Sequence, residues 1–112
     1  MKRSKAIEYF EQGDVLLIPC TIPADAQPRD GVTLAEGEAT GHRHRAIGQH
    51  VSLFERKGVR YLRTLSDAQI EHEEHRTIYV PGRGTAADRK GYEVRIVREW
   101  DHFAEEARNV VD

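Results

Sequence analysis

The sequence predicts an all-β fold, a small single-domain β-barrel or sandwich, from three observations. Short segments rich in strand-forming residues, several alternating between apolar and polar positions, recur along the chain, and glycine or proline separates them. Only residues 103–111 have the apolar spacing of a helix, which predicts a short C-terminal helix. The chain has 112 residues, 38% of them hydrophobic, which suits one domain over residues 1–112 with one modest core.

The individual elements follow in order. Residues 1–12 are expected to form a short helix or an irregular arm that ends at Gly13. Residues 14–19 form a strand that is apolar on both faces, which is typical of a strand covered on two sides. Prolines at positions 19, 23 and 28 predict an extended loop, and Gly58 closes a hairpin turn. The remaining strands are expected at 32–36, 42–47, 51–55, 59–65, 68–72, 76–80 and 92–100, with a polar loop over 81–91.

Composition and charge exclude several functional classes. The formal net charge of -2 excludes a basic field over the whole protein, so nucleic acid could bind only at a local patch. The single Cys20 excludes an internal disulfide and a cysteine-rich zinc site. No apolar signal segment follows the basic first residues, and the longest apolar run, residues 15–18, is too short to span a bilayer. We therefore expect a cytoplasmic protein that does not enter a membrane.

The first of two histidine clusters is His42-Arg43-His44-Arg45, within an expected strand. Residues two apart on a strand point to the same face, so His42 and His44 project together. Two neighbouring imidazoles repel each other when protonated, and this favours an arrangement in which something uses both lone pairs. A divalent metal ion does so.

The second cluster is His72-Glu73-Glu74-His75. In a straight strand, His72 and Glu74 would face inward while Glu73 and His75 faced out. A bulge or turn at Glu73-Glu74 would instead bring His75 inward beside His72. Both versions stay open; we favour the bulge, because it gives a second histidine pair that can meet the first.

Together the clusters predict a site for one divalent transition metal ion: Zn, Fe, Mn or Ni. The expected ligands are His42, His44, His72 and His75. Glu73 or Glu74 is expected to act as an alternate ligand or as a general base. An open coordination position would support a metal-dependent hydrolase, isomerase or oxygenase, whereas a closed shell of four protein ligands would be structural.

Three arginines flank the clusters and suggest a cationic rim for a small anionic ligand: Arg43, Arg45 and Arg76. Salt pairing with neighbouring acidic residues is the competing interpretation. The alternative function is a non-catalytic binding module, in which histidines and arginines form a surface for a nucleotide, a nucleic acid or a protein. A homo-oligomer is also expected, because short sheets often cover an edge with a second copy.

The segment from Gly37 through His42-Arg-His44 to Gln49 resembles the first motif of the cupins, which are small metal-binding β-barrels. In that motif glycine is followed by His-x-His and then by a carboxylate or glutamine. The resemblance covers about a dozen residues. It implies a metal-binding barrel in which His72 or His75 supplies the histidine of the second cupin motif.

Most of the chain is also similar to a group of small bacterial proteins without assigned activity. The shared order is Gly-Asp-Val-Leu-Leu at 13–17, Gly-His-x-His-Arg at 41–45, His-Glu-Glu-His at 72–75 and Arg-Glu-Trp-Asp at 98–101. This second resemblance implies no chemistry.

Overall fold

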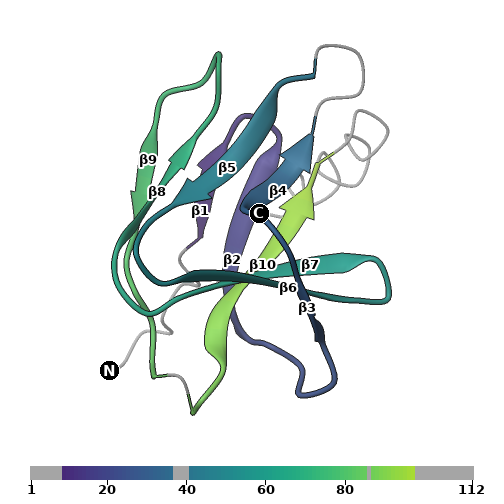
Figure 1. Ribbon diagram of the computed structural model, residues 1–112. Coiled ribbons are helices and arrows are strands. Elements are labelled where there is room, and N and C mark those ends of the chain that lie inside the picture. Colours follow the sequence, from purple (N-terminus) through teal and green to yellow (C-terminus); the bar gives the residue numbers. More distant parts are fainter. Residues whose placement is uncertain (1–8, 37–40, 86, 98–112) are drawn as a thin grey trace, which may run out of the picture.

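The computed structural model describes residues 9–36, 41–85 and 87–97 (Figure 1). Within these residues it contains ten strands, and there is no helix of the length and apolar character that crosses a membrane. The strands are β1 (Phe10–Gln12), β2 (Val15–Thr21), β3 (Gln27–Arg29), β4 (Thr33–Glu36), β5 (Arg43–Ile47), β6 (Val51–Arg56), β7 (Val59–Thr64), β8 (Ala68–Glu71), β9 (Ile78–Val80) and β10 (Lys90–Ile96).

The strands form two antiparallel sheets, which confirms the all-β prediction. The six-stranded sheet has the order β1-β2-β10-β7-β6-β3, and the four-stranded sheet has the order β4-β5-β8-β9. In neither sheet does the last strand pair with the first, so the sheets do not close into a barrel. A barrel was one of the two architectures that the sequence predicted. The hairpin β6–β7 runs across the direction of β2 and β10 (Figure 1).

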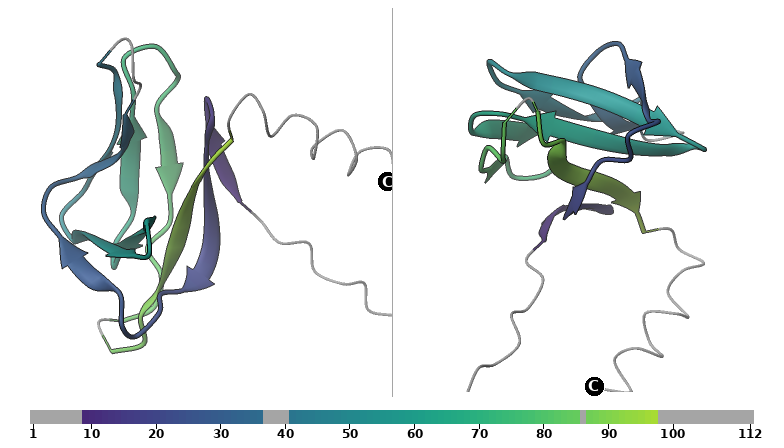
Figure 2. Two further views of the ribbon diagram at one scale, coloured as in Figure 1. Left: turned by 90° about the vertical axis from the view of Figure 1, so that its right-hand side faces the viewer. Right: turned by 90° about the horizontal axis from the view of Figure 1, so that it is seen from below.

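The main core lies between the two sheets, which Figure 2 shows as separate layers. Strands of both sheets contribute fully buried side chains to it, for example Leu17 and Leu62 from one sheet and Leu34 and Ile70 from the other. A smaller cluster around Phe54 packs Ile22, Ala26 and Tyr61 together. In β2, Val15 and Leu17 are buried in the core, whereas Leu16 and Ile18 on the other face are half-buried, so the second face of this strand is covered only in part.

Several element boundaries differ from the sequence prediction. Residues 10–12 form a strand instead of a helix or an irregular arm, because a tight turn at Gly13 pairs Gln12 with Val15. The proline-rich stretch contains the short edge strand β3, in which Pro28 pairs with Phe54 of β6. The last strand begins at Lys90, two residues early. Its expected end at residues 98–100 and the expected C-terminal helix at 103–111 lie outside the described residues.

Three segments of the chain meet at one end of the molecule. These are the β1–β2 turn, the start of β5 and the β8–β9 connection, which lie together at the top of Figure 1. β5 pairs with β8, placing Arg45 opposite Glu71, so the residues that precede β5 and follow β8 come side by side. This end of the fold carries both histidine clusters.

Candidate metal centre

Three histidine side chains, those of His42, His44 and His75, gather around His72. The ring centroid of His72 is 4.3 Å from that of His44 and 4.5 Å from that of His75. The ring of His42 lies edge-on to His72 at a centroid distance of 5.5 Å, and the rings of His44 and His75 stack at 5.9 Å. The structure thus gathers the rings of all four histidines that the sequence predicts as ligands, and among the described residues His42 and His72 are the two whose ligand atoms also group with a carboxylate, that of Glu73, within 4.8 Å.

Strand β5 positions the first pair. His44 is the second residue of β5 and is only 4% exposed, whereas His42 precedes the strand and is half-buried. Arg43 between them is exposed. His42 and His44 both contact His72, as expected for residues two apart on an extended chain.

A turn positions the second pair. β8 ends at Glu71, and residues 72–77 form the connection to β9. Within this connection the backbone N–H of Glu74 donates to Nδ1 of His72 at 3.0 Å. The turn brings His75 beside His72, as the sequence predicted for a bulge; the strand, however, ends at Glu71, so a turn and not a bulge changes the direction of His75. A metal ion on Nδ1 of His72 would replace this hydrogen bond, whereas binding through Nε2 would require the other tautomer of the ring.

The two glutamates of the second cluster lie against the first cluster. His42, His72 and Glu73 offer ligand atoms that all lie within 4.8 Å of one another. The backbone N–H of Arg43 donates to Glu73 Oε1 at 3.0 Å and fixes that carboxylate. Glu74 Oε2 is 3.6 Å from Nδ1 of His42. Two nitrogens and one carboxylate form a donor set that suits several transition metals.

A third segment, which sequence reasoning missed, completes the cluster. Gln12 of β1 is 4% exposed, and its Nε2 donates to the carbonyls of Ile70 and Arg76, both at 2.8 Å. Its Oε1 lies 2.8 Å from Nδ1 of His44. Because both amide protons are used by carbonyls, Oε1 accepts here, and His44 Nδ1–H is the donor.

The β1–β2 turn also contacts the cluster directly. Asp14 Oδ1 lies 3.4 Å from Nε2 of His44. Gly13 has a φ of 59°, and a Cβ at this position would overlap the imidazole of His75. The sequence carries no signal for these contacts, because Gln12 and Asp14 meet His44 only through strand pairing and sheet packing.

The local electrostatics shift the pKa of two of the groups toward the form that binds a cation. Burial lowers the pKa of His44 below its ordinary value; the neighbouring His72 and His75 lower it further, while Asp14 opposes the shift. The Arg43 backbone N–H lowers the pKa of the Glu73 carboxyl. A neutral imidazole and an ionised carboxylate are the ligand forms of these side chains.

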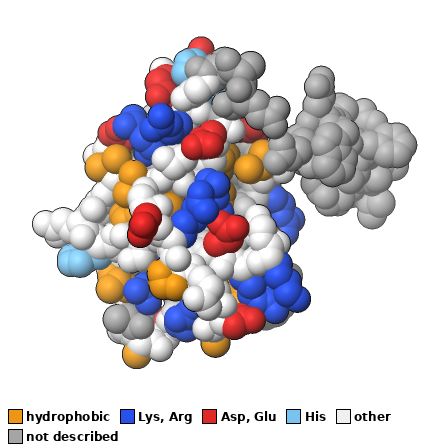
Figure 3. Space-filling view, turned by 45° about the vertical axis from the view of Figure 1, so that its right-hand side comes forward, with side chains coloured by type: hydrophobic (Ala, Val, Ile, Leu, Met, Phe, Trp, Pro, Cys, Tyr) orange, Lys and Arg blue, Asp and Glu red, His pale blue; other side chains and the backbone are white. Residues whose placement is uncertain are grey.

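The three predicted rim arginines differ in their surroundings. Arg45 pairs with Glu71 at 3.6 Å, in line with the salt-pairing interpretation. Arg43 and Arg76 are exposed beside the cluster. The histidine and acidic side chains at this end of the molecule appear together in Figure 3, close to blue basic side chains.

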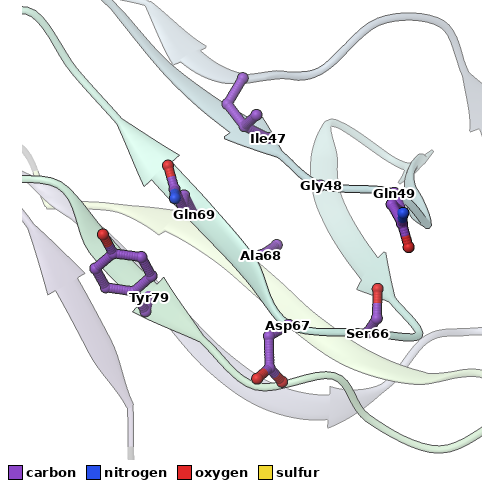
Figure 4. A pocket seen from close by; sticks show the side chains of 8 residues that line it. All are labelled: Ile47, Gly48, Gln49, Ser66, Asp67, Ala68, Gln69 and Tyr79. Atoms are coloured by element: carbon purple, nitrogen blue, oxygen red, sulfur yellow. The ribbon is translucent and has the colours of Figure 1, made fainter.

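A separate open hollow of about 720 Å³ lies at the opposite end of β5 and β8 (Figure 4). Its lining includes Gln49, Asp67, Gln69 and the exposed ring of Tyr79. It shares no residue with the histidine cluster, so we do not assign it to the metal site.

Comparison with known proteins shows the family to which this chain belongs. Residues 11–85 match the model of a family described as "Domain of unknown function (DUF8820)". The chain belongs to this family. No curated protein and no solved structure matches the chain.

The matched residues include every part of the cluster: the β1–β2 turn, the start of β5 and the β8–β9 connection. They end before β10, which supplies the middle of the larger sheet. The candidate metal centre therefore lies within the DUF8820 region. The family description adds no chemistry, so the function has to be argued from the site itself.

Proposed function

We propose that this DUF8820 protein binds a divalent transition metal ion through its histidine cluster. The ligands are His42, His44, His72 and His75, together with the carboxylate of Glu73. One observation carries the proposal: imidazoles from two distant segments gather around His72, with centroid distances of 4.3 to 5.5 Å.

Metal binding accounts for this arrangement better than a surface role for the histidines. Four imidazoles so close together repel one another when protonated, and His44 is only 4% exposed. The carboxylates of Asp14, Glu73 and Glu74 surround the cluster and favour a cation within it. Nitrogen donors with one or two carboxylate oxygens suit Zn, Fe(II), Mn or Ni.

The cluster would support metal-dependent catalysis if one coordination position took water or substrate. A bound ion would then acidify the water or polarise a substrate oxygen, which serves hydrolysis, isomerisation or oxygen chemistry. Glu74, whose Oε2 lies 3.6 Å from Nδ1 of His42, would then act as the general base. The resemblance of His42-Arg-His44 to the first cupin motif is consistent with such a site, although the barrel is not closed.

The proposed substrate is a small anion in the cytoplasm. Arg43 and Arg76 are exposed at the edge of the cluster and supply positive charge there. The same two arginines, with exposed His75, favour the second candidate function, a non-catalytic module that binds an anionic partner such as a nucleotide. That binding would weaken at high salt, survive a chelator and decrease in a variant with Arg43 and Arg76 neutralised.

Metal analysis of the untagged protein tests the proposal. We expect the purified chain, or the chain reconstituted with zinc, manganese or nickel, to retain at least one ion per molecule after desalting. The double variant His42→Ala/His44→Ala should bind more than about 100-fold more weakly, because two ligands are lost. His50→Ala, which removes an exposed histidine bonded to Ser66, is the matched control and should bind normally. A wild-type chain that binds none of these metals would refute the proposal.

Two glycine variants separate stability from metal binding. Gly13 and Gly58 both have positive φ, 59° and 80°, so alanine at either position should cost about 1 kcal/mol of stability. A Cβ at Gly13 would displace His75, whereas a Cβ at Gly58 meets nothing within 4 Å. We therefore expect similar losses in urea denaturation, and weaker metal binding in Gly13→Ala alone. Equal metal affinity in the two variants would remove His75 from the ligand set.

A further inference from the structure

The hollow at the far end of β5 and β8 contains three side chains that strand pairing places in one row (Figure 4). Ile47 of β5 pairs with Gln69 of β8, and Gln69 pairs with Tyr79 of β9. All three point to the outer face of the four-stranded sheet, because a residue next to each of them in its strand is buried in the core. Side chains directly opposite each other on a sheet lie about 5 Å apart, so the row is about as wide as a small organic molecule.

This row exposes apolar surface to water. Tyr79 is 66% exposed and Ile47 is 41% exposed, and they are two of the four large hydrophobic side chains that are exposed in the described part of the chain. Figure 4 shows the ring of Tyr79 beside the amide of Gln69, with Ile47 on the other side of that amide. A ligand with apolar groups of its own would cover this surface favourably.

Asp67 gives the hollow a negative charge. The backbone N–H of Gly82 donates to Asp67 Oδ1 at 3.0 Å, which holds the exposed carboxylate beside the end of β9. Within the part of the chain that the structure describes, no basic side chain forms an ion pair with Asp67. Its charge is therefore available to a ligand.

The basic side chains nearby are engaged elsewhere. No lysine or arginine of the described residues lines the hollow. On the same face of the sheet, Arg45 pairs with Glu71 at 3.6 Å, and Arg83 directs its guanidinium over the ring of Tyr92 at 5.5 Å. The hollow thus disfavours an anion. An unpaired carboxylate together with an exposed aromatic ring suits a cation that has an apolar surface.

We propose that this hollow binds a small organic ammonium ion, with the positive charge near Asp67 and the alkyl groups against Tyr79 and Ile47. A quaternary ammonium group has the required combination, because its charge is spread over apolar methyl groups and is attracted by the face of an aromatic ring. The amides of Gln49 and Gln69 can bond a hydroxyl group of the same ligand. The volume of about 720 Å³ is in the range of small-molecule sites. The site lies apart from the metal centre and does not depend on it.

Two probes of the same shape test the role of charge. Choline and its uncharged isostere, in which carbon replaces the nitrogen, are titrated separately into the untagged full-length chain after metal has been removed, at low ionic strength. Amide chemical shifts measured by nuclear magnetic resonance report the position and the affinity of binding. We expect choline to give saturable shifts at residues 47–49, 66–69 and 79, and the isostere to bind at least about threefold more weakly.

Variants with matched controls test the two main contacts. Asp67→Asn removes the charge but keeps the Oδ1 atom that accepts the Gly82 N–H, so the fold should be retained while choline binds at least about threefold more weakly. Asp30→Asn removes an exposed carboxylate outside the hollow and should bind choline normally. Tyr79→Leu should also weaken binding at least about threefold, whereas Tyr79→Phe keeps the ring and should bind like the wild type.

Three results would overturn the proposal. The first is a wild-type chain that does not bind choline in the hollow, and the second is equal affinity for choline and its isostere, which would indicate an apolar surface with no preference for a cation. The third is unchanged affinity in both Asp67→Asn and Tyr79→Leu. None of these results affects the proposed function, because metal binding is measured separately at the other end of the sheet.

Discussion

Replacing Gln12 with alanine is expected to lower the free energy of unfolding of the metal-free chain by about 3 kcal/mol. Gln12 is 4% exposed, and its amide satisfies the buried carbonyl of Ile70, the carbonyl of Arg76 and Nδ1 of His44. Alanine would leave these three polar groups without their partner in a space that is too small to restore full hydration. The loss should therefore exceed that of an ordinary surface hydrogen bond.

Gln27→Ala is the matched control for this variant. Gln27 is also in a short edge strand, but it is exposed and makes one hydrogen bond of 3.3 Å, to the carbonyl of Asp25. Its replacement should change the free energy of unfolding by less than about 0.5 kcal/mol. Urea denaturation of both variants in the presence of chelator gives the comparison. Equal losses would show that the Gln12 network does not stabilise the fold.

Replacing Leu62 with alanine is expected to cost about 3 kcal/mol. Leu62 is fully buried in β7, where it lies between Tyr92 of β10 and Leu53 of β6 in the register of the larger sheet. Its side chain belongs to the core that both sheets share. Truncation would remove transfer energy and leave a cavity whose walls are fixed by three paired strands.

Leu16→Ala removes the same atoms from a half-buried position in β2. Because its neighbours leave part of the side chain in water, the loss should be about 1 kcal/mol. Guanidinium denaturation measures the free energy of unfolding of both variants. Equal m-values would show that the two variants expose the same surface on unfolding, so that their stabilities can be compared. A Leu62→Ala variant no less stable than Leu16→Ala would contradict the position of the core between the sheets.

Local patterns were sufficient to predict the fold class and most strands. The hairpin at Gly58 is confirmed by the pairing of Arg56 with Val59 and by positive φ values of 50° and 80° at Lys57 and Gly58. Alternation along the chain also predicted that His42 and His44 would share a side. These features depend on neighbours a few residues apart, which a sequence shows directly.

Features set by long-range pairing were not predictable in this way. β1 is a strand because it pairs with β2, and residues 10–12 alone do not indicate it. The contacts of Gln12 and Asp14 with His44 join residues about 30 positions apart, on different sheets. Arg45 pairs with Glu71 because β5 and β8 are neighbours, and no local pattern distinguishes this pair from a substrate site.

The short strand β3 affects how copies of this protein meet. It forms one edge of the larger sheet, where Pro28 has no amide proton to offer to an approaching strand. Beside it, Arg29 is held in an ion pair with Glu55 at 2.7 Å, which keeps charge on the same edge. A strand of a neighbouring molecule that approached this edge would lack a hydrogen-bond donor at Pro28 and would meet the charged side chains of Arg29 and Glu55. This edge is therefore protected against the sheet-to-sheet association that leads to aggregation.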